Sequence, residues 1–101
     1  VHTVAHVTGG GIAGNLARVL PDGADAVVDR TSWESPRIFD EIARLGSVTP
    51  DEMAKVFNLG IGMVVAVPAD SADTAIALLA DHGHQARIIG EVVEGSGEVR
   101  I

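Results

Sequence analysis

The stretch Ala5–Asn15, AHVTGGGIAGN, places three consecutive glycines between an apolar, β-branched run and a segment with helical spacing. The pattern predicts a strand over residues 1–8 and a helix from about Ile12 to Leu20. Glycines at such a junction let the backbone come close to another group, because no Cβ stands in the way. The stretch therefore decides how the first strand and helix are joined, and it raises the question of what the backbone approaches.

One interpretation of the junction is a dinucleotide site. The segment Gly9–Gly14 satisfies G-x-G-x-x-G, and Asp29 follows about twenty residues later, where such folds place a ribose-binding acid. Histidines in the first strand are unusual for a central parallel strand. The helix has room for only about two turns before Pro21. These features, and the irregular order of the later elements, argue against a dinucleotide fold.

A P-loop is excluded by chemistry. Gly9–Gly14 has the required spacing, but Asn15-Leu16 occupies the place of the Lys-Ser/Thr pair that contacts phosphate and magnesium. Two interpretations remain open, a tight turn that only packs a helix against a sheet and a turn whose exposed N–H groups receive an anion.

Composition limits the classes of function. The chain has 101 residues, enough for one domain, and 14 acids against 7 scattered bases give a net charge of −7. This charge argues against nucleic-acid binding, and the absence of cysteine removes thiol chemistry. The longest apolar run, Met63–Val67, is far shorter than the roughly 20 residues of a membrane span. We expect a cytoplasmic protein, and the start at Val1 inside a predicted strand suggests a segment of a larger one.

The remaining elements are predicted from periodicity and capping signals. Strands are expected over 26–29, 63–67, 85–93 and 98–101, and helices over 36–45, from 49 onward and over 71–82. Ser35 is expected as an N-cap before Pro36, Thr49 and Glu52 as a capping box, Asp70 or Ser71 as a cap, and Gly83 as a helix stop.

These elements predict an α+β fold, partly ferredoxin-like, with packed helices on a mixed β-sheet. The continuous run Met63–Val67 suggests a strand buried on both faces. The helix after it suggests a crossover to a parallel neighbouring strand, and the last two strands are expected to form a hairpin. The apolar stripes of helices 36–45 and 71–82 are expected to belong to the core.

Four blocks occur in an order that resembles one enzyme family. They are AHVTGGGIAGNLARVLP (5–21), AVVDRTSWESPRIF (26–39), DEMAKVFNLGIGMVVAVP (51–68) and IIGEVVEG (88–95). Together they resemble the C-terminal part of the phosphoribosylformylglycinamidine cyclo-ligases, the aminoimidazole ribonucleotide synthetases. The resemblance implies that residues 1–101 are a partial C-terminal domain without the N-terminal domain.

The resemblance also implies an activity. The family closes the imidazole ring of formylglycinamidine ribonucleotide in purine biosynthesis, using ATP and Mg²⁺. It implies a homodimer, a small-molecule substrate and an active site between two domains, with most nucleotide and metal contacts in the domain that is lacking here. Related ATP-dependent enzymes, namely formylglycinamidine ribonucleotide synthase-like, selenophosphate-type or hydrogenase-maturation-type proteins, are the alternatives, as is a non-catalytic small-molecule-binding module.

The resemblance assigns substrate or phosphate binding to the glycine junction. The residues are His6, Thr8, Gly9, Gly10, Gly11 and Asn15, and Arg18 completes a family N-x-x-R pattern. Gly14 departs from the family, whose members often carry an acid there. No catalytic residue and no metal ligand is assigned, although His6 and Asp29 are the only plausible acid–base groups.

Several residues carry a structural alternative. His6 is equally compatible with a strand histidine bonded to a neighbour, and an ion pair between Asp29 and Arg30 is favoured over cleft lining. Trp33 is expected to pack rather than to stack on a ligand. Asn58 is expected mainly to shape the backbone, with a contact to the cleft as the alternative.

Overall fold

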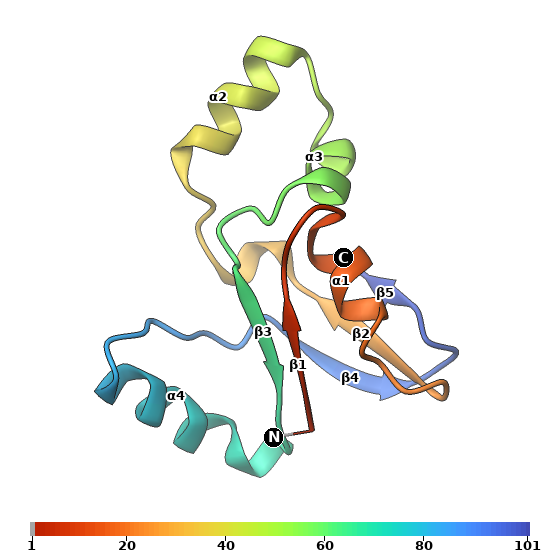
Figure 1. The fold of residues 1–101 in the computed structure, drawn as a ribbon, viewed down its shortest axis with the longest axis vertical. Coiled ribbons are helices and arrows are strands. Elements are labelled where there is room, and N and C mark those ends of the chain that lie inside the picture. Colours follow the sequence, from red (N-terminus) through yellow and green to blue (C-terminus); the bar gives the residue numbers. More distant parts are fainter. Residues whose placement is uncertain (1) are drawn as a thin grey trace.

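The computed structural model describes residues 2–101, so Val1 lies outside the described residues. The strands are β1 (Thr3–His6), β2 (Ala24–Val28), β3 (Met63–Ala66), β4 (Gly90–Glu94) and β5 (Val99–Arg100). The α-helices are α1 (Gly11–Ala17), α2 (Arg37–Gly46), α3 (Pro50–Val56) and α4 (Ala72–Asp81), with short 3₁₀ turns η1 (Arg30–Ser32) and η2 (Ala69–Ser71). The predicted α+β class is confirmed (Figure 1).

The strands form two sheets. β1 and β3 pair antiparallel, with Val4 opposite Val65 and His6 opposite Met63. β2 is the centre of a mixed sheet, antiparallel to β4 and parallel to β5. The predicted mixed sheet is therefore confirmed, whereas the predicted crossover to a parallel neighbour is wrong, since β3 and β4 belong to different sheets. The predicted hairpin is also wrong, because β4 and β5 flank β2 instead of pairing.

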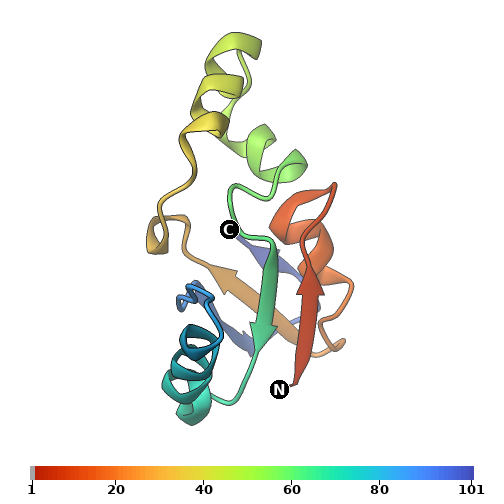
Figure 2. The same cartoon turned by 60° about the vertical axis from the view of Figure 1, so that its left-hand side comes forward.

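The core lies where the two sheets face each other, and α1 closes one end of it (Figures 1 and 2). β1 contributes Ala5 and Val7, β2 contributes Ala26 and Val28, and α1 contributes Ile12 and Leu16. Because β1 and β2 lie in different sheets, the strand–helix–strand unit of a dinucleotide fold does not form.

A buried carboxylate joins β2 to the end of the chain. The side chain of Asp25 is 9% exposed and accepts hydrogen bonds from the backbone N–H groups of Ser96 and Glu98, both at 2.8 Å. Arg100 donates to the same carboxylate at 3.3 Å. The N–H of Glu98, followed by that of Ser96, lowers the pKa of the Asp25 carboxyl below its ordinary value of 3.8.

Two predictions about burial are wrong. The stripes on α2 and α4 are not core, since neither helix contains a buried residue and Leu45 and Leu78 are 75% and 59% exposed. In Figure 1, α2 stands above the sheets and α4 lies to one side of them, so the sheets cover little of either helix. β3 is not buried on both faces either, because it belongs to a two-stranded sheet whose outer face leaves Met63 and Val65 exposed.

The capping predictions are partly confirmed. Thr49 caps α3 by accepting from the N–H of Glu52 at 3.2 Å, and Gly83 follows α4 with φ 84°. Ser71 occupies the N-cap position of α4 without a capping hydrogen bond. Ser35 does not cap α2, because Pro36 takes that position and the helix begins at Arg37. Within residues 2–101 no helix combines the length and apolar character needed to cross a membrane.

Candidate functional site

The glycine junction approaches α3. Gly10 and Gly11 have φ values of 100° and 69°, which residues with a side chain rarely adopt. A Cβ at Gly11 would overlap the carbonyl oxygen of Ala54 and would lie 3.1 Å from that of Phe57. The need for glycine at position 11 is therefore explained by packing against the end of α3.

The buried side chain of Asn15 is hydrogen-bonded to the same turn. It is 6% exposed, and its Nδ2 group donates to the carbonyl oxygens of Gly11 at 2.8 Å, Thr8 at 3.2 Å and Gly9 at 3.3 Å. Its Oδ1 accepts the hydroxyl proton of Thr8 at 3.0 Å. Carbonyl groups only accept, so the carboxamide orientation and the direction of the Thr8 hydroxyl are both determined by chemistry.

This arrangement orients the outer side of the loop. In a trans peptide the N–H and C=O groups point in opposite directions, and residues 2–101 contain no cis peptide bond. The carbonyls of Thr8 and Gly9 point toward Asn15, so the N–H groups of Gly9 and Gly10 point away from it. The loop therefore presents two outward N–H groups, the geometry that suits a bound anion.

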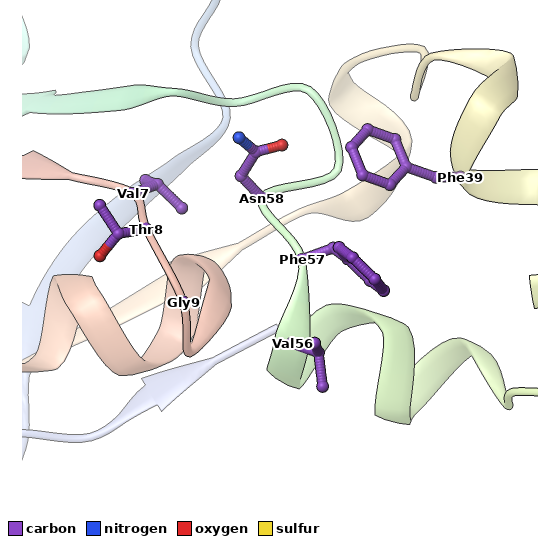
Figure 3. A pocket seen from close by; sticks show the side chains of 7 residues that line it. All are labelled: Val7, Thr8, Gly9, Phe39, Val56, Phe57 and Asn58. Atoms are coloured by element: carbon purple, nitrogen blue, oxygen red, sulfur yellow. The ribbon is translucent and has the colours of Figure 1, made fainter. Parts of the chain in front are cut away.

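A pocket of about 310 Å³ lies beside this loop. It is lined by Val7, Thr8, Gly9, Phe39, Val56, Phe57 and Asn58 (Figure 3). Phe39 and Phe57 lie on the side of the pocket opposite Thr8, and the centroids of their rings are 5.7 Å apart. We call this the loop pocket. None of the seven lining residues is ionisable, so the pocket can position a ligand but offers no acid or base of its own.

The structure brings some of the predicted site residues together and separates others. Thr8 and Gly9 line the loop pocket, and Gly10 and Gly11 continue the turn beside it. Asn15 lies beneath the turn, with its polar atoms bonded to the loop itself. His6 is exposed on the outer face of β1, opposite Met63, and does not line the pocket. Arg18 is exposed at the far end of α1.

Asp29, which follows β2, has a structural role at the end of that strand. Asp29 accepts from the N–H and the hydroxyl of Thr31 and so begins η1, and the hydroxyl of Thr31, followed by its N–H, lowers the pKa of Asp29 below 3.8. The favoured ion pair with Arg30 is wrong, because the Arg30 guanidinium contacts Asp51 at 3.3 Å. Trp33 packs as expected, and its indole N–H donates to the carbonyl of Leu59 at 3.1 Å.

Sequence reasoning missed the aromatic side of the pocket. Phe39 of α2 and Phe57, which follows α3, both line the loop pocket, and neither is among the site residues assigned from the sequence. Asn58 was given a contact to the cleft as its alternative; it lines the pocket while its Oδ1 accepts from the N–H of Gly60 at 2.8 Å. The only sequence signal was Phe57-Asn58 directly before a glycine-rich turn.

The described residues supply no obvious metal centre. In residues 2–101 no group of three or more His, Asp or Glu side chains could hold an ion. Against known families, the chain matches AIR synthase related protein, C-terminal domain, over residues 1–101.

Proposed function

Because the chain belongs to the family of AIR synthase related proteins, C-terminal domain, we propose that it forms one wall of the substrate cleft of an ATP-dependent cyclo-ligase. The parent enzyme would convert formylglycinamidine ribonucleotide to aminoimidazole ribonucleotide. The observation that carries this proposal is the loop of Gly9 and Gly10, whose N–H groups are turned outward by Asn15. These groups would receive phosphate oxygens of the substrate.

The chemistry of the loop pocket favours binding over acid–base work. Two backbone N–H groups stabilise a negatively charged oxygen without a proton transfer, and the rings of Phe39 and Phe57 give the opposite side an apolar surface. Phosphoryl transfer depends mostly on positioning and charge stabilisation. We therefore assign this segment to orienting the phosphorylated substrate, with the base supplied elsewhere.

ATP and Mg²⁺ belong to the proposal for the parent protein. Magnesium prefers carboxylate oxygens in octahedral geometry, and the part of the chain that the structure describes offers no cluster of such ligands. These residues do not fit the metal, so no step is assigned to it here. We place the metal and most ATP contacts in another domain of a cytoplasmic, homodimeric parent.

A substitution at Gly9 tests the loop. A Cβ there meets nothing within 4 Å and φ is not positive, so Gly9→Val is expected to fold while its side chain covers the outward N–H groups. Gly23→Val is the matched control, since position 23 is equally open and lies in a different turn. In the full-length protein, Gly9→Val should raise KM for the ribonucleotide at least about tenfold.

The outcomes separate the assignments. Equal KM values for wild type and Gly9→Val would contradict the role of the loop while leaving the ring closure intact. If the full-length protein closes no ring with ATP, a related ATP-dependent reaction is the next assay. A non-catalytic binding module is favoured by the lack of ionisable groups in the loop pocket, and binding of the ribonucleotide without any turnover would support it.

A further inference from the structure

We propose that the peptide unit joining Asp22 to Gly23 is a modification site, where Asp22 converts spontaneously to isoaspartate. Asp22 is followed by glycine, and no other Asp or Asn of the chain is. The reaction begins when the nitrogen of the following residue attacks the side-chain carboxyl, and glycine carries no side chain that would hinder this attack. The site is independent of the proposed function, because neither residue lines the loop pocket.

The two reacting groups are accessible in the folded chain. Asp22 and Gly23 are both exposed, and they form the turn that leads into β2. Within residues 2–101 the Gly23 N–H donates to no carbonyl, and the Asp22 carboxylate takes part in no hydrogen bond or ion pair. A Cβ at Gly23 would meet nothing within 4 Å. Neither group therefore has to break an existing contact before it reacts.

A backbone hydrogen bond restrains the turn only lightly. The N–H of Ala24 donates to the carbonyl of Pro21 at 3.1 Å across it. Ring closure requires rotation about the backbone bonds of Asp22, and an exposed turn without buried side chains opens locally at little cost in free energy. Glycine at position 23 accepts many backbone conformations. The fold therefore leaves the reactive conformation within reach.

Two other aspartates of the same segment provide a contrast. The side chain of Asp25 is 9% exposed and accepts from the N–H groups of Ser96 and Glu98. Asp29 accepts from both the N–H and the hydroxyl of Thr31. A residue with a side chain follows each of these aspartates. We therefore expect both carboxyls to react far more slowly than that of Asp22.

The conversion leaves the atomic composition of the chain unchanged. The Gly23 nitrogen forms a bond to Cγ of the protonated Asp22 carboxyl and loses its proton, and water leaves as a cyclic succinimide forms. Water then adds to one of the two ring carbonyls. Opening at Cγ restores aspartate, whereas opening at the backbone carbon breaks the original peptide bond. The second product is isoaspartate, in which the chain runs through Cβ and Cγ and the former backbone carbonyl is a free carboxylate.

Isomerisation at this position has a structural consequence. The Gly23 carbonyl accepts from the N–H of Gly95 at 2.9 Å and so ties the turn before β2 to the turn between β4 and β5 (Figure 1). Isoaspartate adds one methylene to the backbone at the preceding residue. The longer chain displaces the carbonyl beside the first pair of the β2–β4 ladder, Ala24 and Glu94. The Gly95 amide should therefore exchange its proton with solvent faster after isomerisation.

Peptide mapping of the aged chain tests the proposal. The full chain is incubated for weeks at neutral pH in water labelled with ¹⁸O and is then digested with trypsin, which releases residues 19–30 as one peptide with all three aspartates. Electron-transfer fragmentation distinguishes isoaspartate from aspartate at each position. We expect isoaspartate and one heavy oxygen at Asp22, and neither at Asp25 or Asp29. The rate should lie within about fivefold of that in the free 19–30 peptide.

Two substitutions test the chemistry of the site. Gly23→Val should slow the reaction at least about tenfold, because a β-branched side chain crowds the attacking nitrogen and stiffens the backbone. Asp22→Glu should abolish it, because the longer side chain would have to close a larger and less favourable ring. Gly14→Ala is the matched control, since it changes an exposed glycine that follows no acid, and it should keep the wild-type rate.

The proposal would be overturned by several outcomes. These are no isoaspartate at Asp22, equal conversion at Asp25 or Asp29, an unchanged rate in Gly23→Val, or a rate more than about tenfold below that of the free peptide, which would show that the fold protects the turn. Unchanged exchange of the Gly95 amide in the isomerised chain would contradict the structural consequence. Circular dichroism checks that each variant is folded. If neither variant folds, the comparison of the three aspartates in the wild-type chain decides the question.

Discussion

The α-carbon of Gly11 lies so close to the carbonyl oxygen of Ala54 that a Cβ at position 11 would overlap it. This contact joins the first turn of α1 to α3. It also carries the loop of Gly9 and Gly10 to the edge of the loop pocket, because the same turn leads from β1 into α1. The packing of two helices thus fixes the position of the candidate binding loop.

Gly11→Ala should therefore destabilise the chain by at least about 2 kcal/mol, because the methyl group overlaps backbone and φ is positive. Gly14→Ala is the matched control. A Cβ at Gly14 meets nothing within 4 Å, and alanine is favoured over glycine within a helix by about 0.5–1 kcal/mol. Urea unfolding of the two variants measures both values, and equal stabilities would refute the packing role of Gly11.

Asn15→Leu should cost about 1–3 kcal/mol of unfolding free energy, because it leaves the Thr8 hydroxyl and three carbonyls without their partner. Asn58→Ala is the comparison, since that side chain makes one local hydrogen bond to Gly60 and should cost less. A smaller loss of unfolding free energy for Asn15→Leu than for Asn58→Ala would show that water replaces the Asn15 carboxamide without penalty.

Asn15→Asp gives a pH-dependent test of the same contacts. A carboxylate cannot donate to the carbonyls of Thr8, Gly9 and Gly11, so we expect the folded state to raise the pKa of Asp at position 15. With a raised pKa in the folded state, stability is lost as the pH rises from the ordinary Asp value through the raised one, and it is recovered as the pH falls below the raised value. Denaturation at several pH values should show this recovery in Asn15→Asp, measured relative to the wild type.

Asp25 should produce the opposite dependence. The pKa of Asp25 is lower in the folded state. Its contribution to stability is therefore complete above the ordinary pKa of 3.8 and is lost as the pH falls through the lower pKa of the folded state. Asp25→Asn should remove most of this pH dependence of stability. Asp29→Asn is the control, because Asp29 is the other carboxyl whose pKa is lowered. The NMR signals of the Ser96 and Glu98 amides should move with the same transition; amides that titrate with Asp29 instead would contradict this.

Leu45 and Ile12 should differ sharply, although both lie on apolar stripes. Leu45→Gln is expected to change the unfolding free energy by less than about 0.5 kcal/mol, because the side chain is 75% exposed. Ile12 is 1% exposed, and Ile12→Ala should cost about 2–5 kcal/mol. A large loss in Leu45→Gln would show that α2 is covered, for example by self-association, which sedimentation would detect.

Local sequence patterns predicted the individual helices and strands better than they predicted which strands pair. The strand before the glycines, the capping of α3 by Thr49 and the helix stop at Gly83 follow from neighbouring residues, and all three are present. Alternation along a strand contains no information about which strand pairs with it. The two-sheet arrangement and the parallel pairing of β2 with β5 depend on contacts between distant residues, which is why the crossover and the hairpin predicted from the sequence are wrong.

The binding role assigned to the Gly9–Gly11 turn stays a prediction. The structure shows that Gly9 lines the loop pocket, whereas Asn15 bonds to the turn itself. Its position offered a signal, because Asn15 falls on the same helix face as Ile12 and Leu16, where a polar residue needs a buried partner. The burial of the α2 stripe was overestimated because an amphipathic pattern shows that a face is apolar and not that this chain covers it.

The central position of β2 also affects how the chain folds during translation. Both of its neighbours come from residues 90–100, so the strand leaves the ribosome long before either partner exists. Until then its apolar face and both of its hydrogen-bonding edges are unpaired, a state that favours aggregation of nascent chains. The mixed sheet is thus completed only after synthesis has passed β5, and Asp25 closes it by binding the turn between β4 and β5.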